Sequence, residues 1–174
     1  YNIVMLNSLY EKTKTWGPGS CMVAFYFFSL IPVSIILLLG THLPNIHLKS
    51  IVISDIDLFI HSLLIAPWFE TLLIQVLVTK VFSIMKCRPT NIIIAVTVIF
   101  SMYHLSNGWI YPLVLLIPGL MFTWNYFLYY EKNEAVWGFL STSVLHFLYN
   151  FTIFVIVPMI NIVLTIYYDT DALN

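Results

Sequence analysis

Long apolar runs constrain this chain more than any other feature. Six of them occupy residues 21–39, 67–85, 91–106, 110–130, 135–153 and 154–168. About 20 consecutive apolar residues let a helix cross a bilayer. Of the 174 residues, 60% are hydrophobic and only 9% are charged, and the mean hydropathy is +0.92, values far from those of a soluble domain. The sequence therefore predicts an integral membrane protein.

The predicted fold is an all-α, polytopic transmembrane bundle with about six spans. Lipid cannot satisfy backbone N–H and C=O groups, so only helices and closed β-barrels span a membrane. The chain lacks the alternating segments of about ten residues that build barrels. Two places leave the span count open: residues 51–65 are short and end before Pro67, and only the region around Pro158 separates the last two runs. A re-entrant or interfacial helix fits either place.

We expect one domain over residues 1–174, because no linker, charge run or internal repeat divides the chain. The first apolar run is longer than a signal-peptide core and no cleavage pattern follows it, which predicts a retained span. Cys21 and Cys87 show no pairing signal and are expected to be free thiols. A net charge of −1 without a basic stripe argues against nucleic acid as a partner.

The basic residues predict an orientation. In a path with six spans, five of them fall on connections that share one side of the membrane: Lys12, Lys14, Lys86, Arg88 and Lys132. The opposite side carries Lys49. Cytoplasmic connections hold the excess of Lys and Arg in membrane proteins, so the side with five basic residues is expected to be cytoplasmic.

Polar side chains interrupt the apolar runs in three different segments. Ionisable groups inside a span cost at least about 2.5 kcal/mol each, so by default they face the bundle interior and serve a function. The interruptions are Glu70 and Gln75 in APWFETLLIQ, His104 in IFSMYHLSN, and His146 and Asn150 in STSVLHFLYN. Residues four apart share a helix face, as His146 and Asn150 do. If these faces meet, a carboxylate, two imidazoles and two amides converge in one dry cavity.

Such a set of groups suits the hydrolysis of an amide. A glutamate and a histidine that share a water, here Glu70 and His104, can take its proton while the oxygen attacks a carbonyl. The imidazole N–H of His146 and the carboxamide N–H of Asn150 can then bind the oxyanion. The non-functional alternative is that His146 or Asn150 only joins helices, a contribution of about 1 kcal/mol or less.

Two other mechanisms stay open. Two histidines and a carboxylate make a possible zinc site with an open fourth position, through Glu70, His104 and His146. No H-E-x-x-H motif is present, so these ligands would come from three separate helices. A serine nucleophile is less well supported, because no third orienting acid is placed for the serines that stand near histidines, which are Ser101, Ser141 and Ser143.

The order of the motifs resembles a known family. E-x-x-x-x-Q begins at Glu70, F-x-x-x-H begins at Phe100 and H-x-x-x-N begins at His146, each on its own membrane segment. Together they resemble the CAAX protease and bacteriocin-processing family, also called the Abi family of intramembrane glutamic endopeptidases. The resemblance covers about residues 66–151, which we take as the core that bears the motifs.

The resemblance implies a role for each matched residue and no cofactor. Glu70 would be the base and His104 its partner. His146 and Asn150 would form the oxyanion hole. Phe100 would pack against the site.

The chain departs from the family at two positions. The first motif of the family usually reads E-E-x-x-x-R, so Thr71 stands where a second glutamate would be and Gln75 where an arginine would be. Because both changes occur together, they leave no unpaired buried charge. They change the groups expected to support Glu70 and leave Glu70 itself as the matched glutamate.

These observations predict an intramembrane endopeptidase that cuts a membrane-associated or lipidated peptide, and the small size favours a bacterial plasma membrane. Fold and site do not define the substrate. One alternative is a non-catalytic immunity or binding protein of the same fold. Another is a small proton-coupled transporter with Glu70 and the histidines as relay, although the chain lacks the paired, interrupted repeats common in such folds.

Overall fold

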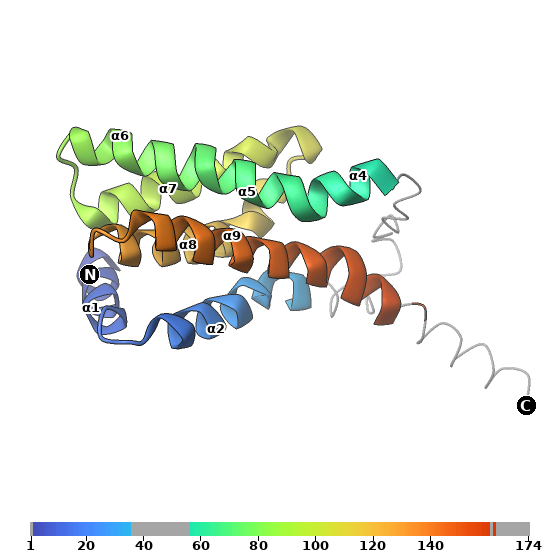
Figure 1. The fold of residues 1–174 in the computed structure, drawn as a ribbon, viewed down its shortest axis with the longest axis horizontal. Helices are drawn as coiled ribbons and strands as arrows, with labels where there is room; N and C mark the ends of the chain where they lie inside the picture. The colour runs from blue at the N-terminus through green and yellow to red at the C-terminus, as the bar shows by residue number, and fades with distance from the viewer. Residues whose placement is uncertain (1, 36–55, 161, 163–174) are drawn as a thin grey trace, which may run out of the picture.

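The computed structural model describes residues 2–35, 56–160 and 162, and all regular structure in these residues is helical. Figure 1 shows the long helices running side by side along one axis, with α1 at one end of the bundle. The predicted all-α fold is therefore confirmed for the described part of the chain.

Most elements join into a few long helices. α1 (Asn2–Thr13) and α2 (Pro18–Ser29) come first. Residues 56–84 then form one continuous helix from α4 (Ile56–Ile60), η1 (His61–Ile65), α5 (Ala66–Glu70), η2 (Thr71–Val78) and α6 (Thr79–Ile84). The chain continues through α7 (Pro89–Tyr103), η3 (His104–Asn107), α8 (Tyr111–Tyr130), α9 (Ala135–Phe151) and η4 (Thr152–Ile156). η1, η2 and η4 are π-helical and η3 is a 3₁₀ turn.

Four helices are long and apolar enough to cross a membrane: His61–Ile84, Pro89–Asn107, Tyr111–Tyr130 and Ala135–Ile160. A shorter apolar helix covers Gly19–Ile35. The chain is therefore a helical integral membrane protein. Cys21 and Cys87, predicted to be free thiols, are in no disulfide.

The predicted break between the last two runs, 135–153 and 154–168, is wrong, because one helix continues to Ile160. Pro158 does not end it because a π-helical turn precedes the proline, with the Val157 N–H bonded to the Thr152 carbonyl. Such local widening lets a membrane helix accommodate proline. Pro67 likewise lies inside the helix of residues 56–84, because the π-helical turn η1 precedes it, with the Ala66 N–H bonded to the His61 carbonyl. Residues 36–55, with Lys49, and most of 161–174 lie outside the described part.

The core forms where α7, α8 and α9 pack together and where α2 covers α8. Phe100, Phe122 and Leu145 are fully buried there. Two polar bonds also join α8 to α9, since Asn125 Nδ2 donates to the hydroxyls of Ser141 and Thr142, each at 2.9 Å. These contacts hold the centre of the bundle, where the polar residues singled out above lie.

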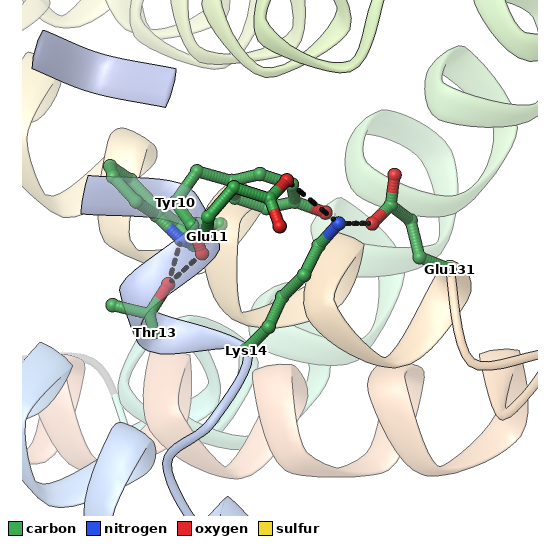
Figure 2. A network of polar contacts seen from close by, with 6 residues as sticks. Tyr10, Glu11, Thr13, Lys14 and Glu131 are labelled. Atoms are coloured by element: carbon green, nitrogen blue, oxygen red, sulfur yellow. Dashed lines mark hydrogen bonds and ion pairs between the residues drawn. The ribbon is translucent and has the colours of Figure 1, made fainter. Parts of the chain in front are cut away.

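A polar cluster fastens α1 to the end of α8 (Figure 2). Lys14 Nζ lies 2.6 Å from Glu131 Oε2 and 3.1 Å from Glu11 Oε1, and 4.6 Å over the ring of Tyr10. Partial burial opposes protonation of Lys14, but bonds to Glu131 and Glu11 raise its pKa above the ordinary value, so the ammonium stays charged. The indole N–H of Trp124 donates to the Thr13 hydroxyl at 3.1 Å.

The segments that carry the five basic residues predicted on one side lie at one end of the bundle (Figure 1). They are α1 with its following turn, the connection between α6 and α7, and the connection between α8 and α9. The predicted grouping therefore agrees with the fold. That this end is cytoplasmic stays a prediction.

Gly138 permits the close approach of α9 to the end of α8. A Cβ at this position would lie 2.9 Å from Tyr129 Cβ and 3.1 Å from the Tyr126 carbonyl oxygen, so Gly138→Ala must push the helices apart. Overpacking of this kind costs about 1–3 kcal/mol, which predicts a Tm lowered by about 5 °C in detergent.

Gly19→Ala is the matched control, because a Cβ at Gly19 meets no heavy atom within 4 Å. We expect its Tm to equal or exceed that of the wild type, since alanine is the better helix former. Equal stability of the two variants would contradict the close packing at Gly138.

Candidate active site

Three of the predicted site residues meet around one carboxylate oxygen. Oε2 of Glu70 lies 3.5 Å from Nε2 of His104 and 3.6 Å from Nε2 of His146. Glu70 is the last residue of α5, His104 follows α7, and His146 lies in α9. Three separate helices thus bring together the groups that the sequence placed on separate segments. The exposed fractions of the side chains are low, 16% for Glu70, 15% for His104 and 4% for His146.

The separations suit groups that share a proton through a third atom. A direct N–H···O bond spans about 2.7–3.2 Å, so both imidazoles lie slightly beyond that range from the carboxylate. All three groups nevertheless lie near enough to one another to bind the same small polar molecule. Glu70 Oε2 and His146 Nδ1 are both buried and form no hydrogen bond with the described protein atoms. Glu70 Oε2 and His146 Nδ1 therefore each keep buried hydrogen-bonding capacity that the described protein atoms do not use.

The backbone sets the orientation of His104. Its Nδ1 lies 3.0 Å from the carbonyl oxygen of Phe100, one helical turn earlier. A carbonyl only accepts, so this hydrogen bond forms when Nδ1 carries the proton. In the neutral ring, Nε2 then has a lone pair and faces Glu70. His104 is held as a proton acceptor beside the carboxylate.

Aromatic rings hold both histidines in place. The Phe100 ring centroid lies 5.0 Å from that of His104 and 5.6 Å from that of His146, so Phe100 packs against both imidazoles. Phe122 stacks on His146 at 4.6 Å. Gly119 lets Phe100 approach α8, because a Cβ there would lie 2.7 Å from the Phe100 ring. The sequence does not identify Gly119 and Phe122 of α8 as part of the site. The available signal was Gly119, because a glycine inside an apolar helix often marks the close approach of another element.

Thr71 and Gln75 stand on the buried side of the same helix as Glu70. Both are 0% exposed, and their side-chain polar atoms have no hydrogen-bond partner among the described residues. They belong to η2, whose i→i+5 register stacks residues five apart more closely than an α-helix does. Gln75 therefore turns towards the face of Glu70. These two neutral residues line the interior without bonding to the carboxylate.

Asn150 forms its hydrogen bond with backbone and not with the three clustered side chains. Its Nδ2 donates to the carbonyl oxygen of Ser62 at 2.9 Å, on the helix that carries Glu70. One of its two N–H groups is therefore engaged by backbone. Of the predicted oxyanion pair, His146 therefore contacts Glu70, whereas Asn150 binds the Ser62 carbonyl.

The serine and zinc alternatives receive no support from the contacts. The Ser101 hydroxyl donates to the Thr97 carbonyl and that of Ser141 donates to the Gly138 carbonyl, so neither is bonded to a histidine. Across the described ranges, no group of three or more His, Cys, Asp and Glu side chains has an arrangement that could hold a metal ion. A zinc site through Glu70, His104 and His146 stays a hypothesis that a chelator can test.

Comparison with known proteins places the chain in a family. The family model described as type II CAAX prenyl endopeptidase, Rce1-like, matches residues 52–152. No curated protein and no solved structure matches the chain significantly. The matched residues are more than half of the chain and include all the clustered side chains. The chain therefore belongs to the Rce1-like type II CAAX prenyl endopeptidases, a family of peptidases.

Proposed function

We propose that this protein is an intramembrane endopeptidase that hydrolyses a peptide bond in a membrane-associated or lipidated peptide. The observation that carries the proposal is the carboxylate of Glu70 between the imidazoles of His104 and His146, at 3.5 and 3.6 Å, in a chain of a peptidase family. Buried carboxylate–imidazole clusters of this kind are typical of acid–base catalysis. A prenylated peptide is the substrate class that the family description suggests.

Glu70 and His104 would activate the water. As the water oxygen attacks the scissile carbonyl carbon, one O–H bond breaks and the proton passes to this pair. The bond from His104 Nδ1 to the Phe100 carbonyl leaves Nε2 able to accept it. The tetrahedral intermediate then collapses, the C–N bond breaks, and the stored proton goes to the leaving amine. No covalent enzyme intermediate is required.

His146 would bind the developing oxyanion. Its ring is held by Phe122 and Phe100, so an Nε2–H would be fixed in direction before the reaction. A preorganised donor in a water-poor site contributes about 3–4 kcal/mol to transition-state binding. The N–H of Asn150 that is not bonded to Ser62 is the second donor of the proposal.

We also propose that the described helices form one domain with its basic end towards the cytoplasm. The shorter apolar helix Gly19–Ile35 and the four long apolar helices would give five crossings instead of about six. The continuity of Ala135–Ile160, where two spans were expected, supports the smaller number.

The central prediction concerns Glu70 and His104. A quenched prenylated peptide, added to the purified protein in detergent, should be cleaved by the wild type. Glu70→Gln and His104→Ala should each lower kcat by about 10²–10⁴-fold, the range that a lost general base produces. A chelator should leave the rate unchanged.

Glu134→Gln is the matched control, because it removes a carboxylate that is exposed and lies in the turn before α9. It should cleave at the wild-type rate. A Glu70→Gln variant as active as this control would reject Glu70 as the base, and loss of activity with a chelator would favour zinc. If the wild type cleaves no peptide but drives the proton-coupled uptake of a solute into vesicles, the proton-coupled transporter would replace the endopeptidase as the proposed function.

A second prediction concerns the aromatic support. Gly119→Ala should displace the Phe100 ring and with it both histidines, lowering kcat by at least about tenfold. Adding Phe100→Leu gives the new methyl group room, so the double variant should recover part of the loss. Wild-type kcat in Gly119→Ala, with an unchanged Tm, would show that this packing does not position the site.

A further inference from the structure

The helix that carries Glu70 has an unusual gap in its hydrogen bonding. In the π-helical turn before Pro67, the Ala66 N–H bonds to the His61 carbonyl, five residues back. In the same register, the next N–H would belong to residue 67 and would point to the carbonyl of Ser62. Proline has no N–H. The Ser62 carbonyl therefore needs a donor from elsewhere.

Asn150 supplies a donor at this carbonyl. Its Nδ2 lies 2.9 Å from the Ser62 oxygen and comes from α9, a different helix. A carbonyl without a donor is costly where the protein shields it from water, and the contact between Asn150 and Ser62 is partly buried. Placing a polar side chain in an apolar helix is also costly. The two costs cancel when the carboxamide and the carbonyl meet.

We propose that the side chain of Asn150 replaces the N–H that Pro67 lacks, and so acts as a positioning residue for Glu70. Glu70 follows Pro67 by three residues, within one helical turn, so the geometry of the turn sets the direction of its carboxylate. α9 also carries His146, one turn before Asn150. The bond from Asn150 to Ser62 thus ties the two helices together about two turns before Glu70 and one turn after His146. The catalytic consequence of this proposal rests on the proposed function.

The chain offers a matched control in its second proline of the same kind. Before Pro158, the Val157 N–H bonds to the Thr152 carbonyl, again five residues back, so the acceptor left by this proline belongs to Ile153. Alanine at Pro67 restores an N–H aimed at Ser62. Alanine at Pro158 restores one aimed at Ile153, which leaves the Ser62 carbonyl unchanged.

The experiment combines these substitutions. Asn150→Leu removes the donor while keeping the same number and branching of side-chain heavy atoms. The Tm in detergent and the kcat and KM for the prenylated peptide are measured for Asn150→Leu, Pro67→Ala and Pro158→Ala, and for Asn150→Leu combined with each proline variant. Asn150→Leu should lower the Tm by about 5 °C, and it should lower kcat with little change in KM. Pro67→Ala alone should resemble the wild type.

The double variants decide the outcome. Adding Pro67→Ala to Asn150→Leu should restore most of the Tm and raise kcat at least about tenfold above that of Asn150→Leu, the scale of a corrected positioning error. This kcat should stay below that of the wild type, because the double variant still lacks the Asn150 N–H proposed to bind the oxyanion. Adding Pro158→Ala to Asn150→Leu should restore neither the Tm nor kcat. Failure of Pro67→Ala to raise the Tm would overturn the proposal, and recovery of the Tm without kcat would overturn the positioning role. If the wild type cleaves nothing, the proposed function fails, and the Tm cycle alone still decides whether Asn150 replaces the missing N–H.

Discussion

A carboxylate held inside an apolar bundle is the constraint on which this structure depends. Glu70 cannot keep a charge there without partners, and its partners come from two other helices, through His104 and His146. The cluster therefore fixes the relative rotation of three spans. Apolar side chains, not further charged groups, surround the cluster. Phe100 and Phe122 pack against the imidazole rings, and the absence of a Cβ at Gly119 leaves room for the Phe100 ring. This arrangement suits a chain with neutral Thr71 and Gln75 beside the glutamate.

The π-helical turns shape the site as much as the side chains do. Three stretches, η1, η2 and η4, are π-helical, and two of them end two residues before a proline. In membrane helices such widening accommodates a residue that cannot donate. Here it also changes which residues share a face, because Gln75 turns towards the side of Glu70. The backbone irregularity is therefore part of how an otherwise uniform helix presents polar groups inward.

The sequence predicts the helices, their apolar character and the meeting of Glu70, His104 and His146, because each signal is local or rests on the cost of burying charge. It fails at Pro158, where proline is read as a break although a π turn carries the helix through. Asn150 shows a second limit. Its spacing from His146 predicts a shared face but not that its N–H reaches the Ser62 carbonyl, since that contact depends on the register of a helix 88 residues away. Gly119 and Phe122 show a third limit. Their contacts with Phe100 and His146 are apolar packing, which no sequence motif marks.

The π turn before Pro67 has a consequence for how this helix tolerates length changes. Each residue of an α-helix advances the chain by about 100° around its axis, so a residue inserted or removed normally rotates everything that follows. A turn that already holds an extra residue can relax to the α register and absorb a deletion locally. Loss of one residue among His61–Ile65 would therefore disturb the face of Glu70 less than the same loss in α7, where the register is regular up to His104.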